Sequence, residues 1–375
     1  MYEEKIVTAS KFSRVKDLFS HKYTSWIIFG IIILTGIIVR ILLWDYTSSD
    51  LYVWKEAAEL LLSGENPYLR TIESFQIPGS AHFYAYFPLW MYICSLVLLI
   101  FPQSWFFIIV KGLILFFDVQ VVLLLYVILQ NKVENKWRLK IPIAIWFVTP
   151  MVIMTGAMHG KFDSMMFVFI LLACLFNERD SIIPEAIFLS LGILTKSITL
   201  IIVPFFFLKE IRERNFKRIL LKIGLIVLPI ILFSIPFLAN PIIYLQGVLG
   251  VHITREHDLG FVYALISMAL TTVKAENILK ICLTVVIAVL WITIIAIAYF
   301  KKLDIYSSCF YTFTMFNSLY WVFLIQYTTW IYTFYVIFTS KSKLKHWALG
   351  SITSFLIILS TVLMALLGLF IKNGL

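Results

Sequence analysis

The charged side chains that interrupt apolar stretches are the residues of this sequence best suited to chemistry. Asp50 follows the first long apolar stretch, where its carboxylate could act as a general base. It could equally cap the short helix predicted after it, because Asp is a favoured N-cap residue. Asp118 interrupts the apolar stretch 113–125. An ionisable residue there indicates either a functional site or a buried hydrogen-bonding role.

Three further positions carry polar groups with a possible role in binding. Asp163 follows a predicted helix break, where it is either a helix cap or a site residue. Lys196 lies in an apolar segment and is predicted to face a cavity or an anion. The polar segment 239–258 contains His252 and Arg255. A guanidinium beside an imidazole suits a phosphate, because the guanidinium donates two parallel hydrogen bonds; the alternative is a solvated loop.

The composition places these residues in a membrane. Of 375 residues, 61% are hydrophobic and 14% are charged, whereas soluble domains have about 45–50% apolar and about 25% charged residues. Apolar stretches of about 20 residues, the length that crosses a bilayer, recur along the chain. The sequence therefore predicts an all-α integral membrane protein with about 10–12 transmembrane helices. Lysines and arginines in loops account for the net charge of +10, and no nucleic-acid partner is expected.

The chain is predicted to form a single membrane domain over residues 1–375. Residues 1–24 are rich in lysine and are expected to be cytoplasmic by the positive-inside rule. The apolar stretch 25–44 is too long for the core of a signal peptide and is interpreted as a retained first span.

The loop 45–80 is predicted to contain an amphipathic helix, 51–63, closed by Gly64 and lying in the membrane interface. Six apolar segments follow, interpreted as six crossings: 82–101, 105–130, 139–157, 162–177, 184–207 and 216–238. An even number of crossings places the loop 45–80 and the segment 239–258 on the same, non-cytoplasmic side. The basic loop 131–140 would then face outward. Either one segment is re-entrant or this loop breaks the positive-inside rule.

Three short motifs, in this order, resemble a known family. They read Asp-Tyr-Thr-Ser-Ser-Asp-Leu-Tyr-Val-Trp at 45–54, Gly-Glu-Asn-Pro-Tyr-Leu-Arg at 64–70 and Tyr-Ala-Tyr-Phe-Pro-Leu at 84–89. The chain is similar here to the C-type (GT-C) glycosyltransferases, and most of all to the GPI mannosyltransferase 1 catalytic subunit and its prokaryotic relatives. The likeness covers about residues 40–265. It continues through Lys111-Gly112 ahead of Asp118, Pro150 and the break ending at Asp163, the Lys196 segment, and His-Ile-Thr-Arg at 252–255.

The resemblance implies a GT-C-like bundle with an interfacial helix in its first outer loop. The catalytic module would occupy 25–258, followed by variable C-terminal helices at 259–375. The implied reaction is an inverting transfer of a hexose, most like mannose, from a polyprenyl-phosphate-linked donor to the hydroxyl of a glycolipid or glycan acceptor. It would take place at the non-cytoplasmic face, among membrane lipids and without a cofactor. The membrane would be the plasma membrane of a prokaryote or the endoplasmic reticulum of a eukaryote.

The resemblance also assigns roles to residues. Asp50 would be the catalytic base, and the donor phosphate would be bound by Arg255, His252 and Lys196. The substrate groove would be lined by Asp118, Tyr84, Tyr86, Asp163 and His159. The GPI enzymes carry an Asp-x-Asp pair in the first loop, whereas Ser48 occupies the first of these positions here. A metal held by two carboxylates is therefore not expected.

Two other functions are compatible with broken apolar helices that carry charges. A secondary transporter would show paired discontinuous helices in two related halves, and the sequence shows no such symmetry. A non-catalytic or polymerase-type protein of glycan export would lack a base at Asp50. The motifs GxxxxGK[ST], GxSxG and HExxH do not occur, so nothing in the sequence indicates nucleotide hydrolysis, serine hydrolysis or zinc proteolysis.

Overall fold

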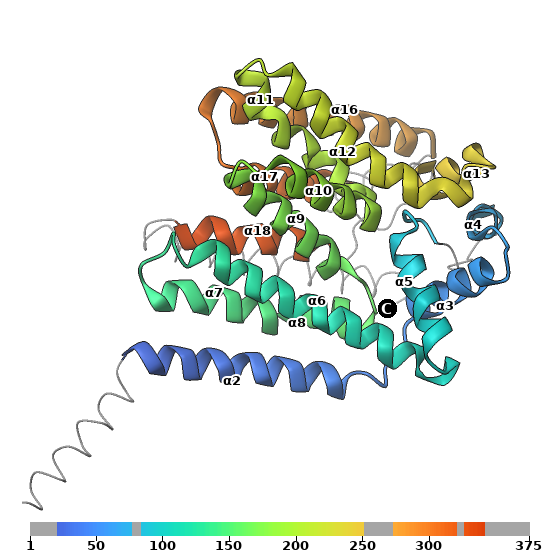
Figure 1. Ribbon diagram of the computed structural model, residues 1–375, viewed down its shortest axis with the longest axis horizontal. Helices are drawn as coiled ribbons and strands as arrows, with labels where there is room; N and C mark the ends of the chain where they lie inside the picture. Colours follow the sequence, from blue (N-terminus) through green and yellow to red (C-terminus); the bar gives the residue numbers. More distant parts are fainter. Residues whose placement is uncertain (1–20, 77–83, 251–272, 321–325, 342–375) are drawn as a thin grey trace, which may run out of the picture.

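The computed structural model describes residues 21–76, 84–250, 273–320 and 326–341, and every regular element in these ranges is helical. The helices form an elongated bundle with two ends (Figure 1). We call the end that holds residues 21–26 and 130–135 the basic end. We call the opposite end, which holds residues 43–50 and 158–163, the site end.

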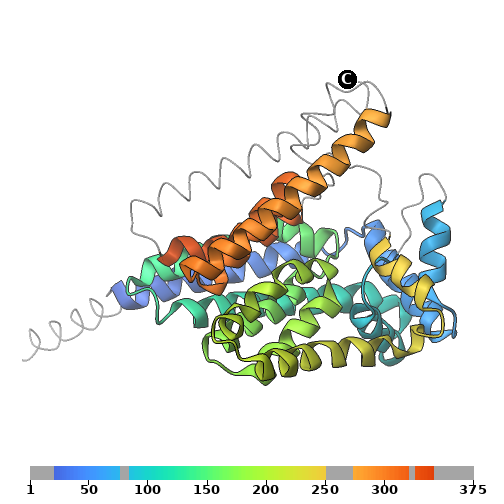
Figure 2. The same cartoon turned by 90° about the horizontal axis from the view of Figure 1, so that it is seen from above.

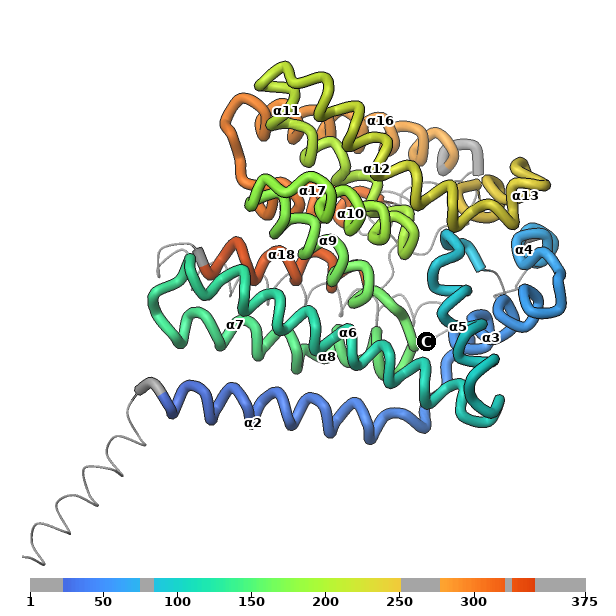
Figure 3. Tube along the Cα trace, viewed as in Figure 1, coloured from blue at the N-terminus to red at the C-terminus, as the bar shows by residue number. Residues whose placement is uncertain are grey.

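The chain runs repeatedly between these two ends (Figures 1 and 3). The elements that run toward the site end are α2 (His21–Leu42), α7 (Lys136–Val148) with α8 (Pro150–Ile153) and the π turn η2 (Met154–Met158), α10 (Ile182–Thr195), α12 (Phe216–Ser234) and α17 (Ile305–Leu319). Those that run back are α6 (Phe106–Leu129), α9 (Asp163–Glu178), the 3-10 helix η3 (Ser197–Phe207) with α11 (Leu208–Arg212), α16 (Val273–Lys301) and α18 (Tyr327–Lys341). Short elements gather at the site end: α3 (Ser49–Leu62), α4 (Pro67–Gln76), α5 (Leu89–Ile100), η1 (Gln103–Trp105), η4 (Ile235–Phe237), α13 (Pro241–Leu245) and η5 (Gln246–Gly250). Seen at right angles in Figure 2, α16, α17 and α18 form a layer on one side of the bundle, opposite α12.

The predicted all-α membrane protein is confirmed. Within the described ranges, four helices are long and apolar enough to cross a bilayer: Tyr23–Leu42, Gln103–Leu129, Phe216–Phe237 and Asn277–Lys301. A fifth candidate is the pair formed by α7 and the turn after it, which is bent by 48°. The predicted number of about 10–12 crossings remains a prediction, because some of the expected spans lie outside the described residues.

The helix predicted in the first loop is present as α3. It runs from Ser49 to Leu62 and is closed by Gly64, whose φ of +81° is the left-handed conformation that commonly ends a helix. Its apolar face is buried, and α3 packs against α5. The helix is therefore held by protein contacts at the site end as well as by its amphipathic sequence.

Two of the six predicted single passes differ in the structure: one segment makes no pass between the two ends, and another makes two. The total number of passes is therefore unchanged. The described part of the segment 82–101 begins at residue 84 and contains the 12-residue α5, which is about 18 Å long at 1.5 Å per residue. Helix α5 lies at the site end, across the direction of α6 (Figure 1). The segment 184–207 makes two passes rather than one, because the chain reverses at Lys196 between α10 and η3. The Thr199 hydroxyl donates to the Gly192 carbonyl across this reversal, at 3.0 Å. The parity of the passes is unchanged, so residues 45–50 and 239–250 do lie at the same end.

The same correction resolves the anomalous basic loop. Lys140 donates to the Ser25 hydroxyl at 2.8 Å, and Lys132 forms an ion pair with Glu178. Both contacts hold the loop 130–135 at the end where α2 begins. The loop thus lies at the same end as the start of α2, and the passes seen here do not require it to break the positive-inside rule. The outcome is neither of the two alternatives, because α5 is a short helix at the site end rather than a re-entrant crossing.

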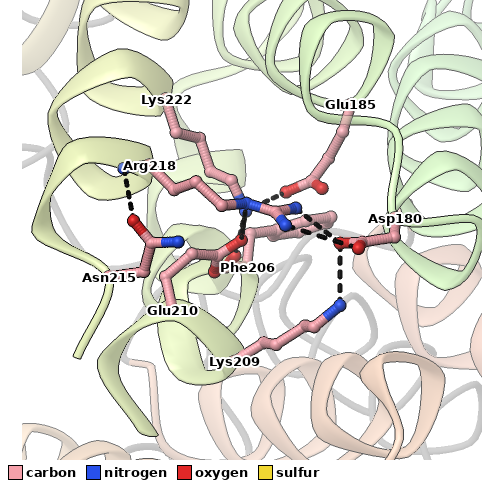
Figure 4. Close-up of polar contacts among 8 residues, drawn as sticks. All are labelled: Asp180, Glu185, Phe206, Lys209, Glu210, Asn215, Arg218 and Lys222. Carbon is pink, nitrogen blue, oxygen red and sulfur yellow. Dashed lines mark hydrogen bonds and ion pairs between the residues drawn. The ribbon is translucent and has the colours of Figure 1, made fainter. Parts of the chain in front are cut away.

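A cluster of buried charges joins the start of α10, the end of η3, α11 and α12 at the basic end (Figure 4). Lys222 of α12 is completely buried and forms ion pairs with Glu185 at 2.7 Å and Glu210 at 2.8 Å. Its ammonium also donates to the Phe206 carbonyl at 2.7 Å. The single side chain thus joins α10, η3, α11 and α12.

An exposed ion-pair group adjoins this cluster. Hydrogen bonds from Arg218 and then Lys209 lower the pKa of Asp180 to about 2. The carboxylate is half exposed, and exposed ion pairs contribute little to stability. We therefore attribute the joining of the helices at this end to the buried Lys222 cluster.

The position of the basic loop can be tested by cysteine labelling. In a chain whose exposed Cys282 is replaced by serine, single cysteines are introduced at Ser49, Glu134 and Glu213, all exposed positions. A membrane-impermeant maleimide applied to sealed vesicles is expected to label Glu134→Cys and Glu213→Cys from one side and Ser49→Cys from the other. Labelling of Glu134→Cys together with Ser49→Cys would contradict the assignment of α5 as a helix that does not cross.

Replacing Lys222 by methionine is expected to destabilise the protein strongly. Methionine fills a similar volume but leaves Glu185 and Glu210 without their cation, and breaking a buried ion pair costs about 3–5 kcal/mol. Thermal unfolding in detergent measures the effect. Lys217→Met, at an exposed position on the same helix, is the matched control and should unfold near the parental temperature. Equal midpoints for the two variants would show that the cluster does not support the fold.

Candidate functional site

The site is organised around a tight turn, residues 159–161, which is hydrogen-bonded to side chains at the start of α3. The Ser48 hydroxyl donates to the His159 carbonyl at 2.6 Å, and the Trp54 indole donates to the Gly160 carbonyl at 3.0 Å. Buried backbone carbonyls require such partners. Side chains at the start of α3 therefore satisfy the backbone of a turn that is more than 100 residues away in the sequence.

The turn itself follows from local sequence. Pro150 begins α8, and the helix then widens into the π turn η2, in which the His159 amide donates to the Met154 carbonyl at 2.9 Å. Such turns occur often at functional sites. Gly160 has a φ of +66°, and a Cβ atom built at this position would lie 2.5 Å from the Leu51 side chain. Only glycine fits between this turn and α3.

The outer part of the site contains Asp50, Lys161, His159 and Tyr46. The Lys161 ammonium lies 2.6 Å from the Asp50 carboxylate, with side chains 14% and 26% exposed respectively. The Tyr46 and His159 rings meet edge to face, with centroids 6.4 Å apart. The sequence predicted site roles for Asp50 and His159, and the structure brings these two residues into one cluster.

Asp50 is not the helix cap that its position in the sequence also allowed. Ser48 occupies the N-cap position of α3, and Asp50 lies within the first turn. The N-terminal end of the helix dipole stabilises a carboxylate there. The capping interpretation is therefore wrong, and the Asp50 carboxylate remains available for another role.

His159 is predominantly neutral at neutral pH. Burial lowers its pKa, and the charge of Lys161 lowers it further, whereas Asp50 acts in the opposite direction. A neutral imidazole offers one hydrogen-bond donor and one acceptor. The outer cluster thus contains one carboxylate, one ammonium and one neutral imidazole.

The inner part of the site is a buried ion pair enclosed by aromatic rings. Asp163 accepts from the Lys196 ammonium at 2.8 Å and from the Trp330 indole at 2.6 Å, both on Oδ1. Lys196 also lies within cation–π distance of the rings of Phe162, Tyr86 and Trp330, at 5.3, 5.4 and 5.9 Å from their centroids. Asp163 is the first residue of α9, after Phe162 at the N-cap. Its carboxylate binds Lys196 and Trp330, so the capping alternative is wrong here too.

Asp118 lies deeper still. Its carboxylate accepts from the Arg40 guanidinium at 2.8 Å and from the Ser164 hydroxyl. Arg40 also donates to the carbonyls of Phe147 at 2.8 Å and Gly36 at 3.0 Å. Asp118 is only 1% exposed. The structure thus places it in the support beneath the site, which is the buried hydrogen-bonding role that the sequence left open.

The two tyrosines assigned to the groove differ in their surroundings. Tyr84 is buried. Its hydroxyl donates to the Phe87 carbonyl at 2.9 Å and accepts from the Met91 amide at 3.0 Å. These two hydrogen bonds hold the backbone at the start of α5. Tyr86 is partly exposed, and its ring contacts those of Trp54 and Phe162. Tyr86 therefore lies between the outer and inner parts of the site, whereas Tyr84 supports the backbone.

Two predicted site residues cannot be placed, and two residues of the site were not predicted. His252 and Arg255 lie outside the described residues. Lys161 was missed, although it lies between His159 and Asp163 and a lysine at a helix break was a visible signal. Trp330 was missed because the 259–375 region carries none of the recognised motifs. Its contact with Asp163 shows that the C-terminal helices contribute to the site.

A family comparison agrees with this geometry. The sequence model of glycosyltransferase family 87 matches residues 90–316, more than half of the chain. The chain belongs to glycosyltransferase family 87. No curated protein matches the sequence.

As a family 87 member, the protein is a membrane glycosyltransferase. The match supports the general part of the sequence resemblance, whereas the specific likeness to GPI mannosyltransferase 1 stays a prediction. The matched region contains His159, Lys161, Asp163 and Lys196 but begins after α3. The role of Asp50 in this family 87 enzyme therefore depends on the geometry described above.

Replacing Gly160 by alanine is expected to damage the site. The variant adopts a left-handed conformation that costs about 1–2 kcal/mol, and its Cβ atom displaces the buried Leu51 of α3. A lower thermal midpoint in detergent and reduced sugar transfer are expected. Gly112→Ala, on α6 where nothing lies within 4 Å of the added atom, is the control and should retain both. The interpretation fails if the two variants behave alike.

Proposed function

We propose that this family 87 enzyme transfers a hexose, most like mannose, from a polyprenyl-phosphate-linked donor to the hydroxyl of a glycolipid or glycan acceptor, with inversion. The observation that supports this most is Asp50. It is a partly exposed carboxylate at the site end, held in the first turn of a helix by the 159–161 turn. A base at such a position can reach a substrate that arrives from the membrane.

The proposed step is a direct displacement at the anomeric carbon. The acceptor oxygen forms a bond to this carbon as the bond between the carbon and the phosphate oxygen breaks. The acceptor proton passes to the Asp50 carboxylate, and the electron pair of the broken bond stays on the lipid phosphate. A positioned general base of this kind contributes about 10²–10⁴-fold in rate.

The lipid phosphate is assigned to Arg255 and His252, as the sequence predicts. The described chain reaches Gly250 at the site end, where the π turn η5 packs against Tyr68 of α4. This places the beginning of the polar segment beside the elements that carry Asp50. Lys196 was assigned to the same phosphate, but its ammonium is buried and bonded to Asp163. We therefore give Lys196 the role of neutralising Asp163.

The arrangement of the two ends supports transfer at the non-cytoplasmic face. The basic loops 130–140 and 208–218 gather at the basic end, which the positive-inside rule assigns to the cytoplasm. The site end then faces outward, in the plasma membrane of a prokaryote or the endoplasmic reticulum of a eukaryote. A lipid-linked donor reaches this end by lateral diffusion, which suits an enzyme with the apolar sequence of this chain.

A transporter was the main alternative on sequence grounds. Buried pairs such as Asp118 with Arg40 are also found in transporters, where ionisable residues mark the ion pathway. Membership of a glycosyltransferase family and a turn gripped by α3 favour the transferase.

Asp50→Asn is expected to lower sugar transfer by about 10²–10⁴-fold, because the amide has the size of the carboxylate without its basicity. Folding should be retained, since Asp50 does not cap α3. Mass spectrometry of membrane glycolipids and glycopolymers, with parent, variant or no protein, gives the product, and thermal unfolding in detergent checks the fold.

Glu59→Gln, on the exposed face of the same helix, is the matched control for this experiment and should transfer sugar as the parent does. A folded Asp50→Asn protein that works within a few-fold of the parent would remove Asp50 as the base.

A further inference from the structure

The Asp50–Lys161 ion pair raises a question that the proposed function leaves open. The ammonium of Lys161 lies 2.6 Å from the carboxylate oxygen Oδ1 of Asp50. An ammonium in such a contact stabilises the negative charge of the carboxylate, and transfer of a proton to the carboxylate gives up that attraction. The structure thus shows the proposed base held by a cation.

Lys161 differs from two other paired lysines, Lys196 of the site and Lys222 at the basic end. Lys196 is 4% exposed and enclosed by rings, and Lys222 is completely buried between two carboxylates. The Lys161 side chain is 14% exposed, and among the described residues its ion-pair partner is Asp50. Its backbone, in contrast, is fixed, because its amide donates to the Thr155 carbonyl at 2.9 Å. Lys161 therefore combines an anchored backbone with a long side chain that faces the outer cluster.

The charges of the outer cluster are balanced only while no substrate is present. Asp50 and Lys161 cancel, and His159 is neutral because its pKa is lowered by burial and by Lys161. A lipid phosphate brings a negative charge to the same end of the bundle. Lys161 is the ammonium that the outer cluster can offer it, and ammonium groups bind phosphate by charge-assisted hydrogen bonds.

We propose that Lys161 exchanges partners during the reaction: it holds Asp50 before the donor binds, and then moves to the phosphate of the polyprenyl-phosphate donor. This inference rests on the proposed function. The move frees the Asp50 carboxylate for the acceptor proton. It also places a cation on the phosphate oxygen that receives the electron pair of the broken bond. Donor binding is thereby coupled to release of the base, and an empty site keeps its base masked.

A binding experiment tests the exchange without any turnover. A short-chain polyprenyl phosphate is titrated onto four purified proteins in detergent: the parent, Lys161→Gln, Asp50→Asn and the double variant. The uncharged polyprenol is titrated in parallel, so that the phosphate contribution is isolated. Lys55→Gln, which breaks an exposed lysine–glutamate pair on α3, is the matched control and should bind as the parent does.

The exchange predicts changes of opposite sign. Lys161→Gln should bind the phosphate lipid about tenfold more weakly, the effect of one charge-assisted hydrogen bond. Asp50→Asn should bind it several-fold more tightly, because Lys161 no longer has to leave a carboxylate. If Asp50→Asn only removed the repulsion between the Asp50 carboxylate and the lipid phosphate, it would tighten binding equally with or without Lys161. The gain from Asp50→Asn must therefore be larger in the parent background than in Lys161→Gln.

Three outcomes would overturn the proposal. Unchanged binding by Lys161→Gln would show that Lys161 does not contact the phosphate. Equal gains from Asp50→Asn in both backgrounds would show that only repulsion was removed. Unchanged binding by Asp50→Asn would show that Lys161 bridges both anions rather than exchanging them. Each can occur while Asp50→Asn still abolishes transfer, so failure of the exchange is distinguishable from failure of the proposed function.

Discussion

An ionised carboxylate inside a bilayer requires a cation, and for the two deepest carboxylates of the described site the cation comes from another segment of the chain. Asp118 of α6 pairs with Arg40 of α2, and Asp163 of α9 pairs with Lys196 where α10 ends. Uncompensated charges of this kind are expensive in lipid. Because each partner lies on a different segment, satisfying the charges also decides which helices become neighbours.

The site depends on this pairing in a graded way. The deepest pair, with Asp118, is sealed; the pair with Asp163 is enclosed by rings; and the pair with Asp50 is partly open. The short segment 159–164 passes through all three levels, because it carries Lys161, Asp163 and Ser164. A rigid interior therefore ends in one contact that is exposed enough to change.

The features set by neighbouring residues could be predicted from the sequence, and those set by distant partners could not. Helix α3 and its closure at Gly64 follow from local periodicity and turn chemistry, and Asp50 shares one end of the bundle with residues 239–250. The partner of Lys196 could not be read from its apolar surroundings, because Asp163 lies 33 positions away. The number of passes was mispredicted for a related reason. The apolar sequence of α5 indicates that the helix is buried in protein or lipid, but it does not indicate the direction in which the helix runs.

The placement of α5 bears on how deeply the protein sits in its membrane. Leu99 and Ile100 at the end of α5 and Trp105 beside it are largely exposed, and tryptophan favours the boundary between hydrocarbon and headgroups. A helix that lies across the bundle with such an exposed face is suited to the interface of one leaflet, where its depth would set the height of α3, which packs against it. A bilayer of another thickness shifts that height at a cost of fractions of a kcal/mol per ångström. The thickness of the surrounding bilayer therefore bears on where the site end lies relative to the lipid headgroups.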